Sequence, residues 1–236
     1  MRTASCVAVI PAKDEAQRIA ATVRGVRDLP QVACVIVVDD GSSDATTEVA
    51  HGAGAEVVRH HRNKGKAAAM TTGSAYAVAQ GYAELPVLFV DADLEESARA
   101  LGALVDPVTG DTADMTIAVL PPQRRAGGGH GFVVRLARDG IQSRTGWQAA
   151  QPLSGMRCLS RAALTTAMPL ARGWGVEVAL TIDVLNAGLR VREVPCELHH
   201  RVSGPGWRGR LHRAAQYRDV WLALARRRRK PAGDKP

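Results

Sequence analysis

Apolar residues in the first ninety positions form short continuous runs, separated by longer stretches with helical spacing. The runs cover residues 6–10, 33–38, 55–59 and 85–90. Each run is short and mostly apolar, as buried strands are, and the stretch containing Ile19, Val23 and Val26 has the spacing of an amphipathic helix. Strands that are apolar throughout are typical of parallel sheets with both faces covered. The pattern therefore predicts an α/β fold with a mostly parallel central sheet flanked by helices.

Polar residues follow each of the four predicted strands. They are Asp14 and Glu15, Asp39 and Asp40, Lys64 and Lys66, and Asp91 and Asp93. Ligands of open α/β sheets bind beyond the carboxyl ends of the strands, so we expect these groups to meet in one cleft. Helices are expected to follow over 67–82 and 95–104. Ser42 and Asp44 also suit helix capping, and Lys64 suits a solvated surface.

Asp91 and Asp93 lie one residue apart at the end of the fourth predicted strand. Side chains of a strand alternate between its faces, so the two carboxylates are expected to point the same way. Two neighbouring carboxylates repel each other, and a hard divalent cation shared with a diphosphate is a common remedy. The alternative is a solvated turn whose charges favour the start of the next helix.

Composition limits the class of protein. The chain has 236 residues, of which 46% are hydrophobic, enough for one large domain with a full core. No run of about 18 or more apolar residues and no signal-peptide pattern is present, so a cytoplasmic location is expected. The four cysteines have no C-x-x-C spacing, which indicates neither zinc nor disulfides.

The positive charge is concentrated near the C-terminus. The formal net charge is +8, and five cations stand consecutively at 226–230. Aromatic residues make up 4% of the chain, too few to favour a single-stranded nucleic acid as partner. Two other nucleotide-binding motifs are also missing. The first turn, beginning at Pro11, lacks G-x-G-x-x-G, and Gly65-Lys66 is followed by Ala67 where a P-loop needs Ser or Thr.

Four motifs, in this order, resemble those of GT-A-fold nucleotide-sugar glycosyltransferases of family 2. They are Val-Ala-Val-Ile-Pro-Ala-Lys-Asp-Glu (7–15), Val-Val-Asp-Asp-Gly-Ser-Ser-Asp (37–44), Asn-Lys-Gly-Lys (63–66) and Asp-Ala-Asp (91–93). The resemblance implies a UDP- or GDP-sugar donor and a divalent metal, Mg²⁺ or Mn²⁺. It assigns these residues to the donor: Pro11, Ala12 and Glu15 to the nucleoside, Asp40 to the base, Lys66 to the nucleotide, and Asp91 with Ala92 to the ribose or sugar. Asp93 is implied as a metal ligand.

Later motifs resemble those of glucosyl-3-phosphoglycerate synthases and polyprenyl-phosphate glycosyltransferases. They lie at 151–155, 173–180 and 193–201. The resemblance implies that Ser154, Gly155 and Gly175 bind substrate and that Glu177 is catalytic, orienting the sugar or acceptor. It makes His200 the second metal ligand beside Asp93, with His199 as the alternative. Between these motifs and the first half, the Gly-rich basic loop 121–131 is expected to close on an acceptor phosphate through Gly129 and His130, or else to be a simple connector.

Two positions depart from the family pattern. Glu177 is followed by Val178, where inverting enzymes usually carry an aspartate that serves as general base. The acceptor is then already an anion, such as a lipid phosphate, or the reaction is retaining and the departing diphosphate takes the acceptor proton. The loop has Gly129-His130-Gly131-Phe132 where the phosphoglycerate synthases have Gly-Arg-Val-Thr, which argues against phosphoglycerate as the acceptor.

The C-terminal segment predicts a basic amphipathic helix over 207–229. Its apolar stripe comprises Leu211, Ala214, Ala215, Val220, Trp221 and Leu224. Such a helix binds an anionic membrane, the catalytic body or a second subunit, and the interruption of the stripe by Arg218 favours the body.

The expected organisation is a glycosyltransferase domain over 1–205, with a nucleotide-sugar-binding half (1–120) and an acceptor half (121–205), followed by a helix and tail at 206–236. The expected activity is metal-dependent transfer of glucose or a related hexose to a small, phosphorylated or otherwise anionic acceptor. The alternatives are a polyprenyl-phosphate glycosyltransferase at the inner membrane face and a catalytically silent partner subunit that binds nucleotide-sugar. A homodimer is compatible with the sequence, and no nucleic-acid partner is expected.

Overall fold

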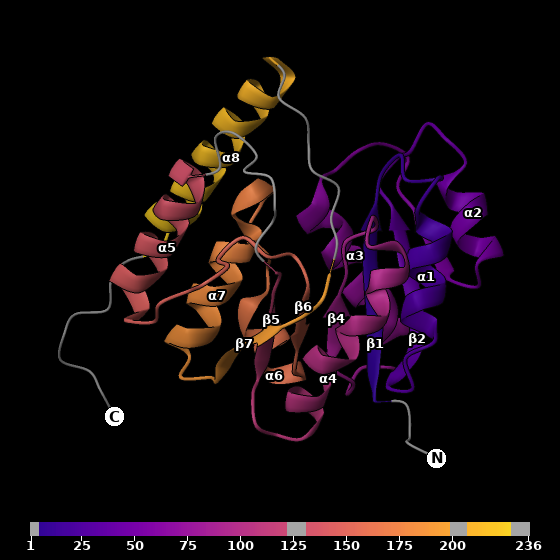
Figure 1. Ribbon diagram of the computed structural model, residues 1–236, viewed down its shortest axis with the longest axis horizontal. Coiled ribbons are helices and arrows are strands. Elements are labelled where there is room, and N and C mark those ends of the chain that lie inside the picture. The colour runs from indigo at the N-terminus through magenta and orange to yellow at the C-terminus, as the bar shows by residue number, and fades with distance from the viewer. Residues whose placement is uncertain (1–4, 122–130, 199–206, 228–236) are drawn as a thin grey trace.

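A seven-stranded sheet forms the centre of the protein (Figure 1). The structure is a computed structural model that describes residues 5–121, 131–198 and 207–227. In the last of these segments, side chains are described from residue 214 onward. The strands are β1 (Cys6–Ala12), β2 (Val32–Asp39), β3 (Glu56–Arg59), β4 (Val87–Phe89), β5 (Met115–Val119), β6 (Arg157–Leu159) and β7 (Val191–Pro195). Their order across the sheet is β3-β2-β1-β4-β6-β5-β7. All neighbours pair in parallel except β6, which is antiparallel to β4 and β5. The expected mostly parallel α/β sheet is confirmed.

Helices cover both faces of the sheet (Figure 1). They are α1 (Ile19–Arg27), α2 (Thr46–Gly52), α3 (Lys66–Ala79), α4 (Gly102–Thr109), α5 (Gly131–Thr145), α6 (Arg161–Ala167), α7 (Val176–Asn186) and α8 (Trp207–Ala225), with 3-10 helices η1 (Glu95–Leu101) and η2 (Gly173–Gly175). One core contains residues of α1, η1 and α4, and the other contains residues of α3, α6 and α7. Successive residues of β1 alternate between the two cores, with Ala8 and Ile10 in the first and Val7 and Val9 in the second. This burial on both faces explains why β1 is apolar throughout.

The structure shifts some of the expected boundaries. The fourth strand is only Val87–Phe89, shorter than the apolar run 85–90. The helix expected over 95–104 is a 3-10 helix up to Leu101 and continues as α4 to Thr109. The apolar pattern located each element, but hydrogen bonding to neighbouring strands and turns determines where it ends.

The antiparallel strand β6 brings a distant segment to the end of β4. Phe89 pairs with Arg157, and Val87 pairs with Leu159. Because the two strands run in opposite directions, the residues that precede Arg157 lie beside those that follow Phe89. The loop before β6 therefore reaches the carboxyl end of β4, where Asp91 lies.

Helix α8 packs on the body of the protein beside α5 and α7 (Figure 1). Its residues Val220 and Leu224 are buried in a third core that also contains residues of α5 and α7. Trp221, expected in the same stripe, is instead 54% exposed, because the buried face is formed by positions 220, 223 and 224. In the part of the chain that the structure describes, every helix is too short or too polar to cross a lipid bilayer.

Candidate active site

A cavity of about 350 Å³ opens at the carboxyl ends of β1, β2 and β4. Its lining residues are Pro11, Ala12, Lys13, Asp40, Asn63, Gly65, Lys66, Asp91, Gly173, Trp174 and Glu177. The chain continues from β1 to β2 and β3 on one side, and β4 lies on the other side, so the cavity stands where the strand order reverses. This is the position at which open α/β sheets bind their ligands.

Asp40 organises the loop that forms one wall of this cavity. Its carboxylate accepts hydrogen bonds from the backbone N–H groups of Lys64 (2.8 Å) and Gly65 (2.7 Å), and its Oδ1 lies 2.8 Å from Nδ1 of the buried His60. Burial alone would raise the pKa of Asp40, but these hydrogen bonds outweigh it and hold the pKa below its ordinary value. Asp40 is therefore an anion that fixes the backbone of the Asn-Lys-Gly-Lys motif.

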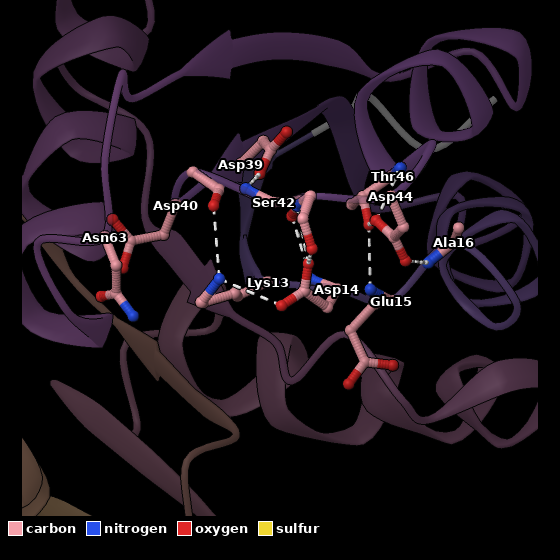
Figure 2. Close-up of polar contacts among 12 residues, drawn as sticks. Lys13, Asp14, Glu15, Ala16, Asp39, Asp40, Ser42, Asp44, Thr46 and Asn63 are labelled. Carbon is pink, nitrogen blue, oxygen red and sulfur yellow. Dashed lines mark hydrogen bonds and ion pairs between the residues drawn. The ribbon is translucent and has the colours of Figure 1, made fainter.

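The turn after β1 is tied to the turn after β2 by side chains that bind backbone N–H groups (Figure 2). Ser42 Oγ accepts from the N–H of Asp14 at 2.9 Å, and Asp14 Oδ1 accepts from the N–H of Ser43 at 2.8 Å. Thr46 Oγ1 accepts from the N–H of Glu15 at 2.9 Å. The two turns thus hold each other in place beside the cavity.

Several of the polar residues expected in the cleft serve this scaffold and do not line the cavity. The buried Asp39 accepts from the N–H of Ser42 at 2.8 Å, and Asp14 belongs to the turn network. The carboxylate of Glu15 lies 2.6 Å from Arg18 and also stands outside the lining. Lys64 is exposed, which agrees with the alternative that its side chain is solvated at the surface. Its backbone N–H donates a hydrogen bond to Asp40.

Lys66 links two carboxylates at the centre of the site. Its Nζ lies 2.8 Å from Oδ1 of Asp91 and 3.1 Å from Oε1 of Glu177. Burial by itself would lower the pKa of Lys66, but the two carboxylates outweigh this and raise its pKa above the ordinary value. Lys66 is therefore a firmly charged cation that neutralises part of the negative charge of Asp91 and Glu177.

The loop before β6 packs against this ion-paired cluster. A Cβ atom on Gly155 would lie 2.4 Å from Nζ of Lys66 and 2.7 Å from Oδ1 of Asp91, so a side chain there would displace the cluster. Its neighbour Ser154 is buried, and its Oγ has no hydrogen-bond partner among the described residues. A buried hydroxyl without a partner is costly. Ser154 itself lies outside the lining of this cavity.

Arg157 fixes the loop before β6 through hydrogen bonds. Its fully buried guanidinium donates to the carbonyl oxygens of Ser154 (2.8 Å) and Pro152 (3.2 Å) and to Oγ1 of Thr181 on α7 (2.8 Å). Burial lowers its pKa to about 10, although the charge of Glu177 acts in the opposite direction. Arg157 remains charged at neutral pH and links the loop to the helix that carries Glu177. Arg157 was not among the residues predicted from the sequence, where its only signal is a charge inside a short apolar run.

The donor atoms at the end of β4 fit a hard divalent cation. Asp91 and Asp93 are both partly buried and offer carboxylate oxygens, the ligands that Mg²⁺ and Mn²⁺ prefer. No group of three or more metal-binding side chains occurs among the described residues. Magnesium that is linked to a nucleotide is usually held by one or two carboxylates together with phosphate oxygens.

Other predicted site residues have varied positions. Gly129, His130, His199 and His200 lie outside the described residues. Ala92 is buried behind the two aspartates. Gly175 faces α8, while the neighbouring Trp174 lines the cavity. Trp174 and Asn63 are thus lining residues that the sequence analysis did not single out.

The sheet order and the cluster at its carboxyl edge are those of a GT-A glycosyltransferase, and the motif resemblance is confirmed by a family comparison. The model of glycosyl transferase family 2 matches residues 7–163, so the chain belongs to this family. It is also similar to the glycosyltransferase AglJ of Haloferax volcanii. The two are 28% identical over 213 residues, which make up 86% of this chain and 66% of that relative.

Among solved structures, the chain is similar to glucosyl-3-phosphoglycerate synthase of Mycobacterium tuberculosis. The complex with phosphoglyceric acid has a TM-score of 0.77 and 28% identity, covering 97% of this chain and 82% of the other. A complex of the same enzyme with Mn²⁺, UDP and phosphoglyceric acid also has a TM-score of 0.77, at 27% identity over 97% of this chain and 80% of the other. The chain is therefore a glycosyltransferase by family and fold.

Proposed function

We propose that this enzyme transfers glucose or a related hexose from a UDP- or GDP-sugar to a small, phosphorylated or otherwise anionic acceptor with the help of Mg²⁺ or Mn²⁺. The observation that carries the proposal is the Lys66 bridge between Asp91 and Glu177 at one end of the cavity. It places hydrogen-bonding carboxylates beside a wall formed by Pro11, Ala12 and Asp40. The Mn²⁺ and UDP in the similar synthase support the same choice of donor and metal.

The nucleoside would lie along Pro11, Ala12 and Asn63, with Asp40 reading the base or fixing the loop that does so. Lys66 would face the donor, and Asp91 and Glu177 would accept hydrogen bonds from sugar hydroxyls. Asp93, together with His200, would hold the metal, which when bound neutralises charge that develops on the leaving diphosphate. Ser154 and Gly155 would contact the substrate from the loop before β6.

The acceptor half is proposed to be residues 121–205, and the nucleotide-sugar half residues 1–120. Val178 follows Glu177 on α7, at the position where a general base was expected. We therefore propose a retaining reaction in which the departing diphosphate takes the acceptor proton. An acceptor that is already anionic at its reacting oxygen would need no base either.

A second candidate is transfer to a polyprenyl phosphate at the cytoplasmic membrane face. Tyr217 and Trp221 are 45% and 54% exposed, and they lie one turn apart on α8 beside exposed Arg218. Aromatic and basic side chains on one helix favour contact with an anionic bilayer. The third possibility, a silent nucleotide-sugar-binding subunit, has no comparable observation in its favour.

A donor screen tests the proposal. Thermal shift would be measured with UDP, GDP, UDP-glucose and GDP-mannose, each with Mn²⁺ and with EDTA. We expect stabilisation by one nucleotide and its sugar, and a smaller effect in EDTA. Release of the nucleotide from the selected donor then separates an enzyme from a silent subunit, since active enzymes usually hydrolyse some donor without acceptor. Absence of any nucleotide-dependent shift would contradict the proposal.

A further inference from the structure

A second cavity, of about 150 Å³, adjoins the nucleotide cavity. The two share Lys66, Asp91, Trp174 and Glu177 as a common wall. The far wall of the smaller cavity comes from α8, which contributes Gln216 and Val220. Helix α8 is therefore part of the site, even though it follows the segment matched by the family model.

Close packing holds α8 at this wall. A Cβ atom on Gly173 would lie 2.1 Å from Oδ2 of Asp219, and one on Gly175 would lie 2.5 Å from the carbonyl oxygen of Asp219. Gly173 also has a φ of +67°, which L side chains rarely adopt. The two glycines permit α8 to approach, and Oδ2 of Asp219 then accepts a hydrogen bond from the backbone N–H of Trp174 at 3.2 Å. The lining of both cavities thus depends on the position of α8.

The C-terminal end of α8 is also fixed on the body of the protein. Gly140 on α5 leaves space for Leu224, because a Cβ atom there would lie 2.5 Å from both Cδ atoms of that leucine. Arg144 donates to the carbonyl oxygens of Leu224 (3.1 Å) and Arg227 (2.8 Å), and Arg227 is ion-paired with Asp183 on α7. The helix is consequently held at Asp219, between Gln216 and Val220, and again at its C-terminal end.

The charged groups that line the smaller cavity suit a ligand with hydroxyl groups. Among the residues that the structure describes, its lining contains one cation, Lys66, and two carboxylates, Asp91 and Glu177. That balance is one negative charge, and Lys66 is already paired with both carboxylates. Hydroxyl groups of a ligand can donate hydrogen bonds to the carboxylates of Asp91 and Glu177.

The size and the remaining lining agree with a hydroxylated ring. A cavity of about 150 Å³ is large enough for a six-membered ring, since one of that size in another protein binds benzene. Val133, Leu153 and Val220 offer apolar surface, and Trp174 offers an aromatic one. Gln216 offers both donors and an acceptor. These are the groups needed to bind the faces and the hydroxyls of a sugar.

We propose that α8 completes the pocket for the transferred sugar ring and that Gln216 is a specificity-determining residue that hydrogen-bonds to a ring hydroxyl. This inference rests on the proposed donor function and adds to it the residue that distinguishes one sugar from another. In this arrangement the diphosphate lies in the larger cavity and the sugar ring lies in the smaller one. Lys66, Asp91 and Glu177 lie between them.

The test compares Gln216→Ala and Gln216→Glu with Leu222→Ala, a control at an exposed position of α8. Calorimetry with Mn²⁺ would measure binding of UDP and of its glucose and galactose derivatives, or of GDP and its mannose derivative if the screen selects GDP. Initial rates would give kcat/KM for each sugar. Melting temperatures would establish that each variant is folded.

We expect both Gln216 variants to bind the free nucleotide as the wild type does, within about twofold, and to lose about tenfold or more in kcat/KM for the preferred sugar. The preference between sugars should shrink in the Gln216 variants, while Leu222→Ala keeps it. If nucleotide binds but the preference is unchanged in both Gln216 variants, the inference is wrong and the donor function stands. If the wild type binds no nucleotide, the donor function itself fails, and the inference fails with it.

Discussion

The ammonium nitrogen of Lys66 lies 3.1 Å from Oε1 of Glu177 and joins the start of α3 to the start of α7 across the carboxyl edge of the sheet. The same nitrogen lies 2.8 Å from Oδ1 of Asp91. One cation therefore holds together carboxylates from two parts of the chain that are distant in sequence. The positive charge of Lys66 relieves the mutual repulsion of these carboxylates.

Replacing Lys66 is expected to destabilise the fold as well as the site. The pKa of Lys66 is raised above its ordinary value of 10.5, so its stabilising effect is fully present below that pH and is lost as pH rises through the folded-state pKa. At pH 7, Lys66→Met should lower the free energy of unfolding by about 1–3 kcal/mol, less than for a fully buried pair because the side chain is 26% exposed.

Urea unfolding at pH 7 measures this loss, and Lys64→Met is the matched control. Lys64 is exposed and interacts with Asp40 through its backbone N–H, which the substitution keeps. The control should unfold as the wild type does. Equal stability of Lys66→Met and the wild type would show that the bridge contributes nothing.

Asp93→Ala should abolish sugar transfer and metal-dependent nucleotide binding while leaving the fold intact, because the proposed metal loses a carboxylate ligand. Nucleotide affinity with and without Mn²⁺, together with circular dichroism, measures both effects. Glu96→Ala is the control, since this nearby carboxylate is exposed and paired with Arg99. Retained transfer in Asp93→Ala, or full wild-type activity in EDTA, would rule out this metal site.

Asp40→Ala should weaken nucleotide binding by about 1–3 kcal/mol. The backbone N–H groups of Lys64 and Gly65 lose their hydrogen-bond acceptor, and the cavity loses a polar lining residue. Calorimetry with the nucleotide selected by the donor screen measures the change. Unchanged affinity would leave Asp40 with a purely structural role in the loop.

The same carboxylate predicts a specific loss of stability in acid. The folded-state pKa of Asp40 lies below its ordinary value of 3.8, so its contribution is present above that pH and is lost as pH falls through the folded-state pKa. The difference in melting temperature between the wild type and Asp40→Asn should therefore shrink as pH falls below about 4. A difference that stays constant down to pH 3 would contradict this assignment.

Ending the chain after Gly206 should lower the melting temperature, because Val220 and Leu224 leave the third core and Trp174 loses its contact with Asp219. The intact protein is expected to remain in the supernatant with anionic vesicles at low salt. Co-sedimentation of the intact chain, but not the shortened one, would instead favour the polyprenyl-phosphate candidate. Binding that fades as salt is raised would identify the arginine-rich end as the contact.

The edge of the sheet at which the cavity lies could be predicted from the sequence because both signals are local. A buried parallel strand requires an apolar run, and the residue after it emerges at the edge where ligands bind. Asp40, Lys66 and Asp91 were placed at one cavity by this rule, and the structure places them there. Asp14 and Asp39 follow the same rule, yet their carboxylates bind backbone N–H groups of the turns. Local sequence does not distinguish a ligand-binding carboxylate from one that caps a turn.

The sequence by itself determined the α/β class, the order of the motifs and the family, since these depend on periodicity and on residues adjacent in the chain. Only the tertiary structure decided that β6 is antiparallel, which brings Gly155 against Asp91, and that α8 reaches the site through Asp219. Both are contacts between segments far apart in sequence. They depend on which strands pair and on how closely two helices approach each other. The pattern of apolar and polar positions in one segment contains no information about its distant partner.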